Sequence, residues 1–436
     1  MASPAFSLKS YQDRLAQVDS TPIMGRVVRS VGLLIESTGP RAAVGSVCEI
    51  ASSSGPPLAV EVVGFQDAML LTVPLGDTSG IRPGDRVIAR GTSASVAVGP
   101  ALLGQVVDAL GQPLDGTRLQ LPDRYPLRPA PLNPLDREPV KTPIGTGVRA
   151  VDGLLTCGRG QRVGLFGGSG VGKSTLLGML TRGAAADVIV LGLVGERGRE
   201  VRGFLENDLG PEGRKRSVVV VSTSDNPPLL RMRAAYTATS IAEYFRDQGK
   251  NVLLLMDSVT RFAMAQREVG LAAGEPPTTK GYPPSVFAEL PALLERAGSV
   301  RGRGSITAIY TVLVEGDDHN EPVADAVRAI LDGHIVLARD LASRNHYPAI
   351  DILRSVSRTM PDVTDAAHRD KAGVVRGWMS LIRDTEDLVS VGAYVPGANP
   401  RVDEARSRAE AIDSFLCQPA DTLCGFADAA KALKEL

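Results

Sequence analysis

The spacing of hydrophobic and polar residues changes along the chain, and its first regular pattern is that of short strands. Between about Thr21 and Val98, apolar runs such as LAVEVVGF and RVIAR are separated at short, regular intervals by Gly, Pro and Ser. Segments of this kind present apolar residues to one face and polar residues to the other, which is typical of a small antiparallel barrel. We therefore predict a β-barrel domain over residues 20–98.

A second pattern runs from about Gly99 to Pro361. Compact apolar runs such as QRVGLF, DVIVLGLVGE, RSVVVVSTSD, NVLLLMD, SITAIYTVLV and HIVLARD alternate with helical stretches such as KSTLLGMLTRGA and AYTATSIAEYFRDQGK. Strands that are apolar throughout are usually buried on both faces, as in a parallel sheet with helices on each side. The pattern predicts an α/β domain over residues 99–361.

The two ends of the chain have helical periodicity. KAGVVRGWMSLIRDTEDLV and DEARSRAEAIDSFLCQ predict a small α-helical domain over residues 362–436. Apolar residues in the arm 1–19 also recur at roughly helical spacing. Two interpretations of this arm stay open, a frayed terminus and a docking helix for a partner protein.

Composition narrows the function classes. The 48 basic and 49 acidic residues nearly cancel, which argues against disorder and against a chain that binds polyanions over its whole surface. Aromatic residues make up only 4%, too few for an extended surface that stacks unpaired bases. No apolar run is long enough to span a membrane, the N-terminus lacks a secretory pattern, and the four cysteines lack zinc-type spacing. We expect a cytoplasmic protein with reduced cysteines.

The strongest chemical motif is GGSGVGKS, which matches G-x-x-x-x-G-K-[ST] between a predicted strand and a predicted helix. Its glycines let successive backbone N–H groups point at one phosphate, and the helix adds its positive dipole end. The lysine supplies a cation for the outer phosphates and the serine a hydroxyl for Mg²⁺. The predicted nucleotide-binding residues are Gly167, Gly168, Ser169, Gly170, Val171, Gly172, Lys173, Ser174 and Thr175.

Three further segments carry candidate chemistry. Asp257 ends NVLLLMD, at the strand edge where the phosphate loop is expected, and can orient a magnesium-bound water. Glu196 and Arg197 follow the strand DVIVLGLV; the carboxylate is placed either to polarise an attacking water or in a surface loop of ion pairs. Arg358 ends SVSR, and spacing alone assigns it no role.

Taken together, these motifs resemble a known family. GGSGVGKST, GLVGERGREVRGFLEND, MDSVTRFAMAQREVGLAAGEPPTTKGY, YTVLVEGDDHNEP and SVSR strongly resemble the ATPases of type III protein export, relatives of the catalytic subunit of rotary ATP synthases. TSDNPPLLRMRAAYTAT is more similar to the flagellar export ATPase than to the virulence-secretion ATPase. The resemblance covers roughly residues 20–400.

The resemblance implies both a fold and roles for single residues. The fold is a central RecA-like P-loop NTPase domain with a parallel sheet, preceded by the small β-barrel and followed by the helical domain. Glu196 matches the general base that aligns the hydrolytic water, and Arg197 helps to hold it. Arg358 matches an arginine finger donated across a subunit interface, and Tyr347 matches an aromatic residue that packs on adenine. The implied cofactors are ATP and Mg²⁺, with Ser174 and Asp257 serving the metal.

The resemblance also implies partners and a location. We expect a homohexameric ring, a peripheral stator protein on the N-terminal arm, and a central stalk protein in the pore. An export gate and chaperone–cargo complexes are further expected partners, and nucleic acid is not. The implied location is the cytoplasmic face of the inner membrane, with peripheral membrane association only.

Four other functions remain as alternatives. A virulence type III secretion ATPase shares most of the motifs. The catalytic subunit of an ion-translocating ATP synthase carries an arginine where this chain has Glu275, which disfavours it. An RNA or DNA translocase needs a basic pore, for which RGRG at 301–304 is the one candidate loop. A nucleotide-binding structural subunit is disfavoured by the intact Glu196 and Lys173.

Overall fold

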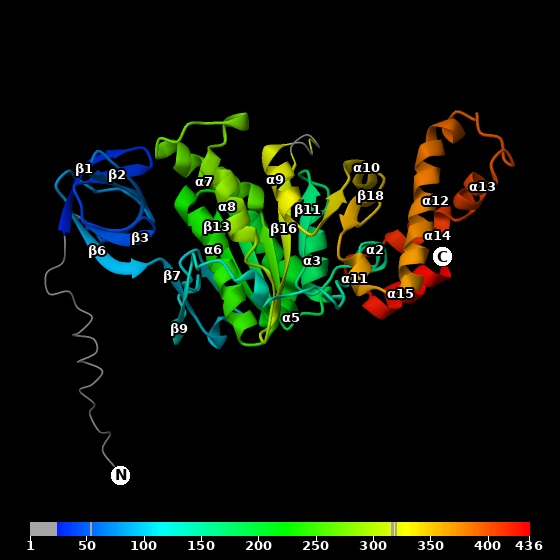
Figure 1. The fold of residues 1–436 in the computed structure, drawn as a ribbon, viewed down its shortest axis with the longest axis horizontal. Coiled ribbons are helices and arrows are strands. Elements are labelled where there is room, and N and C mark those ends of the chain that lie inside the picture. Colours follow the sequence, from blue (N-terminus) through cyan, green and yellow to red (C-terminus); the bar gives the residue numbers. More distant parts are fainter. Residues whose placement is uncertain (1–23, 53–54, 315–317, 319–320) are drawn as a thin grey trace, which may run out of the picture. The chain divides into compact units, whose positions relative to one another are not determined.

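The computed structural model describes residues 24–52, 55–314, 318 and 321–436, and the predicted N-terminal arm 1–19 lies outside them. The chain divides into two compact units (Figure 1). The first extends to Ala94 and also takes in residues 272–274. The second comprises residues 95–271 and 275–436.

The first unit is a closed six-stranded barrel, which confirms the predicted barrel fold. Its strands follow the order β1-β2-β5-β4-β3-β6, and Met24 of β1 pairs with Ile88 of β6 to close it. Alternation along the strands directs residues such as Val60 and Val62 into the interior, where Cys48 is also buried. The strands are β1 (Met24–Val31), β2 (Leu34–Ser37), β3 (Ser46–Ala51), β4 (Leu58–Gln66), β5 (Met69–Pro74) and β6 (Arg86–Ser93).

The second unit is built on a mostly parallel sheet, as the apolar runs predict. The strands run in the order β18-β17-β11-β16-β14-β12-β13-β8, and those from β17 to β8 are parallel. They are β8 (Val106–Asp108), β11 (Arg162–Gly167), β12 (Val188–Glu196), β13 (Ser217–Thr223), β14 (Asn251–Asp257), β16 (Ser305–Leu313), β17 (Gly333–Leu337) and β18 (Ile350–Ser357). Every residue from Val188 to Gly195 is buried, which is why this strand reads as a continuous apolar run.

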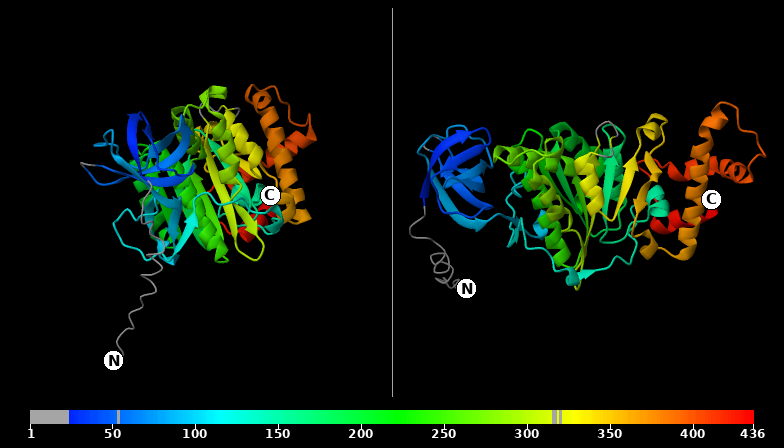
Figure 2. Two further views of the ribbon diagram at one scale, coloured as in Figure 1. Left: turned by 60° about the vertical axis from the view of Figure 1, so that its left-hand side comes forward. Right: turned by 45° about the horizontal axis from the view of Figure 1, so that its top comes forward.

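Helices cover both faces of the sheet (Figures 1 and 2). The long helix α6 packs on β12, β13 and β14, and an atom added at Gly192 would lie 3.1 Å from Ala238 on that helix. The alternate strand residues Leu191 and Leu193 face a core shared with Leu176 and Leu180 of α3. The helices of this domain are α2 (Arg149–Leu154), α3 (Lys173–Gly183), α4 (Gly198–Gly203), α5 (Gly210–Lys215), α6 (Pro228–Asp247), α7 (Val259–Ala272), α8 (Pro284–Leu294), α9 (Pro322–Ile330) and α10 (Arg339–Ser343), with a π-helical segment η3 (Phe204–Leu209).

Smaller elements complete the second unit. Ser95–Val98 form β7, which pairs with β9 (Asp123–Pro126) inside the second unit. β10 (Arg137–Glu138) pairs with β15 (Gly298–Val300), and β15 makes a hairpin with β16. Three 3₁₀ turns complete the loops, at Pro100–Leu102, Pro134–Asp136 and Thr279–Gly281.

The edge strand β18 is absent from the sequence-based prediction. It runs antiparallel to β17, with Gly333 opposite Ser357. The sequence-based strand HIVLARD is also too long, because its last residues begin the short helix α10. The antiparallel direction matters because it carries the end of β18 to the edge of the sheet at which the parallel strands begin.

The C-terminal segment is helical, as predicted. Its long helix α12 is capped at the N-terminus by Asp365, whose side chain accepts a hydrogen bond from the backbone N–H of His368. Val375 of this helix is buried. The helices are α11 (Met360–Val363), α12 (Ala366–Ser390), α13 (Pro400–Ser407), α14 (Ala409–Leu416) and α15 (Phe426–Glu435). Among the described residues, no helix combines the length and the apolar character needed to cross a bilayer.

Candidate nucleotide-binding site

The glycine-rich loop joins the end of β11 to the start of α3, which is the context that the motif requires. Gly170 and Gly172 have φ of 82° and 92°, values that glycine adopts without strain. Lys173 is the first residue of α3, an 11-residue helix whose N-terminal N–H groups face the loop. The loop therefore has the backbone geometry of a phosphate cradle.

The loop opens into a cleft of about 990 Å³. Two predicted catalytic residues, Glu196 at the end of β12 and Arg197 directly after it, lie in the same cleft as the loop. So do several charged residues of α7 and of the loops after it. The lining includes Gly168, Ser169, Gly170, Gly172, Lys173, Ser174, Thr175, Glu196, Arg197, Glu200, Arg261, Arg267, Lys280 and Arg339.

Lys173 and Asp257 form a tight ion pair at the base of the cleft. The distance from Lys173 Nζ to Asp257 Oδ1 is 2.6 Å, and the two side chains are 13% and 9% exposed. Thr311 of β16 donates a second hydrogen bond to the same carboxylate oxygen at 2.6 Å. The adjacent strands β14 and β16 thus hold Asp257, and Asp257 holds the lysine close to the loop.

Glu196 is a buried carboxylate with an unfilled hydrogen-bonding position. Its Oε1 lies 3.8 Å from Lys173 Nζ and has no hydrogen-bond partner within the described part of the chain. Burial, and then the charge of Asp257, raise its pKa to about 7; the charge of Lys173 works against them. At neutral pH this group is therefore divided between its acid and base forms, which suits proton transfer.

Arg197 contacts Glu200 and not Glu196 directly. Its Nη1 donates to Glu200 Oε1 at 2.9 Å, and its side chain is 71% exposed. Glu200 in turn accepts a hydrogen bond from the carboxyl of Glu196. Although burial raises the pKa of Glu200, this hydrogen bond and that of Arg197 lower it below its ordinary value. Arg197 thus reaches Glu196 through Glu200.

Tyr347 lies beside the phosphate loop although it is 175 residues distant in the chain. A Cβ added at Gly172 would stand 3.3 Å from the Tyr347 ring, and the ring is 40% exposed. The backbone carbonyl of Tyr347 accepts a hydrogen bond from Gln418 N at 2.9 Å. An exposed aromatic face next to the loop is a suitable surface for a purine base.

Arg358 lies at the opposite edge of the sheet from the phosphate loop of its own chain. Its backbone N–H donates to the backbone carbonyl of Asp332. The side-chain carboxylate of Asp332 accepts a hydrogen bond from the backbone N–H of Arg162, at the start of β11. The loop begins at the other end of that strand, about 17 Å away at the usual rise per residue. An arginine side chain does not bridge that distance, so Arg358 does not reach the phosphate site of its own chain.

Sequence reasoning missed three residues of the site. Glu196 ends β12 and Glu200 lies in the first turn of α4, so no regular spacing in the sequence signals that the two carboxyls meet. Thr311 lies inside an apolar strand, where no local pattern marks it. Arg261 follows Asp257 by four residues; its side chain packs against Gly195 and its Nε is buried without a partner among the described residues.

The donor set fits magnesium. Ser174 is exposed in the cleft. Asp257 supplies one carboxylate beside Lys173, although it does not itself line the cleft. No cluster of three or more His, Cys, Asp or Glu side chains with metal-binding geometry exists in the described ranges. Magnesium is usually held by one or two carboxylates together with substrate phosphates and water, so a dense cluster of protein ligands is unnecessary.

Comparison with known sequences agrees with this geometry. Residues 27–91 match the β-barrel domain and residues 147–357 the nucleotide-binding domain of the ATP synthase alpha/beta family. Residues 364–435 match the T3SS EscN ATPase C-terminal domain. A relative from Bacillus subtilis, named flagellum-specific ATP synthase, is 53% identical over 95% of each chain. The chain belongs to the ATP synthase alpha/beta family.

Other relatives locate it among the export members of that family. The Salmonella typhimurium flagellum-specific ATP synthase is 51% identical over 98% of this chain and 96% of its own length. A type 3 secretion system ATPase from Xanthomonas euvesicatoria is also 51% identical, over 92% and 91%. The predicted family, the fold of barrel, P-loop domain and helical domain, and the enzyme class of ATPase are confirmed.

A solved structure extends the agreement to three dimensions. The assembled ATPase EscN of the enteropathogenic E. coli type III secretion system superposes with a TM-score of 0.90 at 46% identity, over 94% of this chain and 99% of that one. A second structure holds EscN in complex with its central stalk EscO, with a TM-score of 0.87, 45% identity and the same coverage.

Proposed function

We propose that this chain hydrolyses MgATP at sites between the subunits of a hexameric ring, and that hydrolysis drives type III protein export during flagellar assembly. The observation that carries the proposal is the carboxyl of Glu196. It is buried 3.8 Å from the P-loop lysine, it has an unfilled oxygen, and its pKa is raised to about 7. A base of this kind facing a phosphate cradle serves hydrolysis better than it serves simple nucleotide binding.

Nucleotide binding rearranges the charges in the cleft. The phosphates accept hydrogen bonds from the backbone N–H groups of the loop. Lys173 then exchanges part of its contact with Asp257 for contacts with the outer phosphate oxygens. Magnesium, when bound, neutralises charge on the transferred phosphoryl group. Ser174 and Asp257 are the residues that would hold it. Tyr347 packs against the base.

Glu196 then orients the attacking water and accepts its proton. The unfilled Oε1 is the acceptor, and the shared proton between Glu196 and Glu200 must leave before it can act. Arg197 favours that loss, because its contact with Glu200 stabilises negative charge on the pair. The water attacks the γ-phosphorus in line with the bond to ADP.

Arg358 completes the site of the neighbouring subunit. Arg358 lies beside the start of β11, and the loop of its own chain lies at the other end of that strand, about 17 Å along it, which supports action in trans. An arginine finger contributes about 10³ to 10⁵ in rate, which corresponds to about 4–7 kcal/mol of barrier. A lone subunit is therefore a poor ATPase, and the ring is the working unit. The assembled state of EscN named in its structure supports the same arrangement here.

The partners follow from the same group of relatives. A central stalk in the pore is supported by the complex of EscN with EscO. We further propose a stator protein on residues 1–19, and export-gate and chaperone–cargo contacts at the cytoplasmic face of the inner membrane. RGRG at 301–304 does not favour a nucleic-acid pore, because Arg303 pairs with Asp247 in a tight turn between β15 and β16.

Virulence secretion is the second candidate. The match of residues 364–435 to the EscN C-terminal domain and the close superposition on EscN favour it. The two candidates share the chemistry and differ in the export apparatus. Deletion of the gene followed by a motility assay separates them. Loss of filaments supports the flagellar assignment, and a motile strain that fails to secrete effector proteins supports the alternative.

Two variants test the chemistry. Glu196→Gln keeps the shape of the side chain but removes the basic oxygen, so nucleotide binding should persist while kcat falls by at least about 10³-fold. Arg358→Ala should also keep nucleotide affinity while kcat falls by about 10³-fold or more. A Glu196→Gln protein with normal turnover would show that another group accepts the proton.

A further inference from the structure

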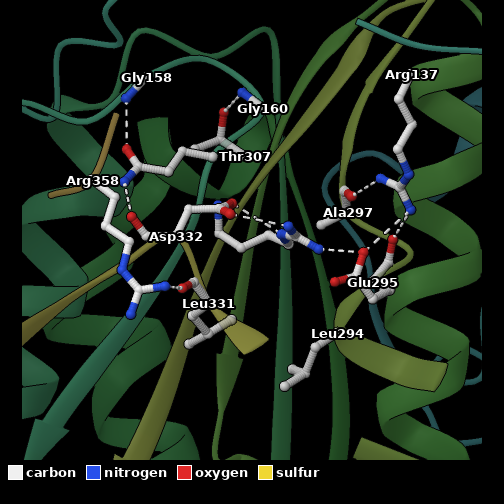
Figure 3. A network of polar contacts seen from close by, with 12 residues as sticks. Arg137, Gly158, Gly160, Leu294, Glu295, Ala297, Thr307, Leu331, Asp332 and Arg358 are labelled. Atoms are coloured by element: carbon white, nitrogen blue, oxygen red, sulfur yellow. Dashed lines mark hydrogen bonds and ion pairs between the residues drawn. The ribbon is translucent and has the colours of Figure 1, made fainter. Parts of the chain in front are cut away.

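A compact polar cluster lies at the edge of the sheet where the parallel strands begin, and Arg358 is part of it (Figure 3). At its centre, Arg162 and Asp332 make a two-pronged contact. Arg162 Nε and Nη2 donate to the two carboxylate oxygens of Asp332, each at 3.0 Å. The backbone N–H of Arg162 adds a third bond at 3.0 Å, and Asp332 N–H returns one to the Arg162 carbonyl at 2.9 Å. Such paired charge-assisted bonds fix both residues in one geometry.

Gln161 ties the same segment to the end of β18. Its side chain is fully buried, and its Nε2 donates both to the carbonyl of Asp332 and to Ser357 Oγ at 3.1 Å. Its Oε1 accepts a hydrogen bond from Gly158 N at 2.8 Å. Because this amide is enclosed and its oxygen and nitrogen are both hydrogen-bonded, it holds the backbone carbonyl of Asp332 in place.

Arg358 rests on the peptide groups that this cluster holds. Its backbone N–H donates to the carbonyl of Asp332 at 3.0 Å, and its guanidinium Nη1 donates to the carbonyl of Leu331 at 3.2 Å. The side chain itself is exposed. Both the backbone and the guanidinium of Arg358 are therefore positioned by the carbonyls of residues 331–332.

The surrounding ion pairs explain why the guanidinium of Arg358 stays available to bind a phosphate. The Asp332 carboxylate is occupied by Arg162, and Arg162 is further paired with Glu295 at 2.5 Å. Arg358 is left with a neutral carbonyl, a weaker partner than a carboxylate, and it can exchange that contact for a phosphate oxygen. Were Asp332 not occupied, it would compete with phosphate for the guanidinium.

We propose that Asp332, Arg162 and Gln161 are positioning residues for Arg358. They fix its backbone and keep its guanidinium presented toward the nucleotide of the neighbouring subunit. This inference rests on the proposed function of Arg358 in trans. Because displacement of a catalytic group by about 1 Å costs about 10²-fold in rate, a loosened cluster should lower kcat without altering nucleotide binding in the chain that carries the change.

The first test uses rings of a single variant. Asp332→Asn keeps the shape but loses the charge of the two-pronged contact, and we expect kcat to fall about 10- to 100-fold. The Kd for a fluorescent ATP analogue should stay within about twofold, because the binding site lies at the other end of β11. Glu295→Gln removes the outer ion pair of Arg162 and leaves the contact with Asp332 intact, so it serves as the matched control with nearly normal kcat.

Mixed rings then test the direction of the effect. Each variant is combined with an excess of Glu196→Gln subunits, which offer a normal Arg358 but do not hydrolyse. Asp332→Asn subunits should regain the activity of wild-type subunits diluted in the same way, because their own sites are intact. Lys173→Ala subunits should not regain activity, because their defect lies in their own site.

The outcomes separate the inference from the function on which it rests. In the mixed rings, wild-type subunits diluted among Glu196→Gln subunits serve as the reference. If they remain active and Arg358→Ala subunits do not regain activity, Arg358 does not act in trans. If Arg358→Ala is rescued and Asp332→Asn is not, the positioning role is wrong.

A double variant gives an independent reading in unmixed rings. In an Arg358→Ala background, Asp332→Asn should lower kcat by less than about twofold, because Asp332 acts through the missing side chain. A further loss of about 10-fold would overturn the inference. Should Asp332→Asn lose nucleotide affinity, Ser357→Ala, which removes one contact of Gln161, takes its place. An unchanged kcat for Ser357→Ala in rings with an intact Arg358 would count against the inference, and so would a further loss of about 10-fold in the Arg358→Ala background.

Discussion

The raised pKa of Glu196 predicts that its ionised carboxylate lowers the stability of the folded protein. We consider the substitution Glu196→Gln in the absence of nucleotide. The pKa of this carboxyl rises from an ordinary 4.5 to about 7 in the folded chain. Since one pKa unit corresponds to about 1.4 kcal/mol, the ionised group costs about 3 kcal/mol of folding free energy. The side chain is only 13% exposed, so solvent screening reduces this figure little.

The sign of the effect depends on pH. Below pH 4.5 the carboxyl is protonated in both the folded and the unfolded chain, and no penalty exists. As the pH rises through the interval from 4.5 to 7, the unfolded chain releases this proton before the folded chain does, and the wild type loses stability. Glutamine does not titrate. The free-energy advantage of Glu196→Gln should therefore grow from about 1 kcal/mol at pH 5.5 to about 3 kcal/mol at pH 8.5.

Thermal and urea unfolding of both proteins, measured without nucleotide at several pH values, checks this prediction. The difference between the two proteins is the informative quantity, because titrating groups away from Glu196 contribute equally to both, and only its neighbours Glu200 and Asp257 respond to the change. Glu386→Gln is a suitable control, since Glu386 forms an exposed pair with Arg344 and its loss should change stability by less than about 1 kcal/mol. A Glu196→Gln advantage that is absent at pH 8.5, or that does not vary with pH, would refute the electrostatic reasoning.

Three further predictions concern activity. With Mg²⁺ in excess, kcat/KM should fall about tenfold per pH unit below an apparent pKa near 7. Glu200→Gln should shift this fall to lower pH, because it removes the hydrogen bond that raises the pKa of Glu196. A kcat/KM that does not change from pH 5.5 to 8 would contradict the assignment of Glu196 as the base. Lys173→Ala should abolish both nucleotide binding, measured with a fluorescent analogue, and turnover; retained affinity would argue against its contact with the phosphates. Dilution below the assembly threshold should lower ATPase activity per subunit, and constant activity at all concentrations would exclude the role of Arg358 in trans.

Local patterns were enough to predict most elements of the fold. The phosphate loop is a contiguous motif whose glycines, lysine and flanking elements are all encoded within about 25 residues, so no distant contact is needed to recognise it. The buried strands of the sheet are likewise visible, because burial on both faces produces uniformly apolar runs such as β12. The barrel strands and the C-terminal helices follow from their spacing of apolar residues.

The failures have a common physical cause. β18 carries mixed buried and exposed residues because it lies at the edge of the sheet, so it lacks the apolar signature of the central strands. Thr311 looks like any small residue in a buried strand until the pairing of β14 with β16 brings it to Asp257. Nothing in the sequence indicated that Glu200 lies between Arg197 and Glu196, which depends on how α4 begins.

The amino-acid sequence by itself thus determined the class of fold and the phosphate loop, since each depends on residues that are neighbours in the chain, whereas the role of Glu196 as a candidate base came from the resemblance to a known family. Tertiary structure alone decided the pKa of Glu196, because burial and the charges of Asp257 and Lys173 come from three different strands and helices. It also decided the location of Arg358, because strand direction sets which edge of the sheet a residue occupies. Electrostatic fields and strand order both depend on distances in space, and spacing along the chain does not record them.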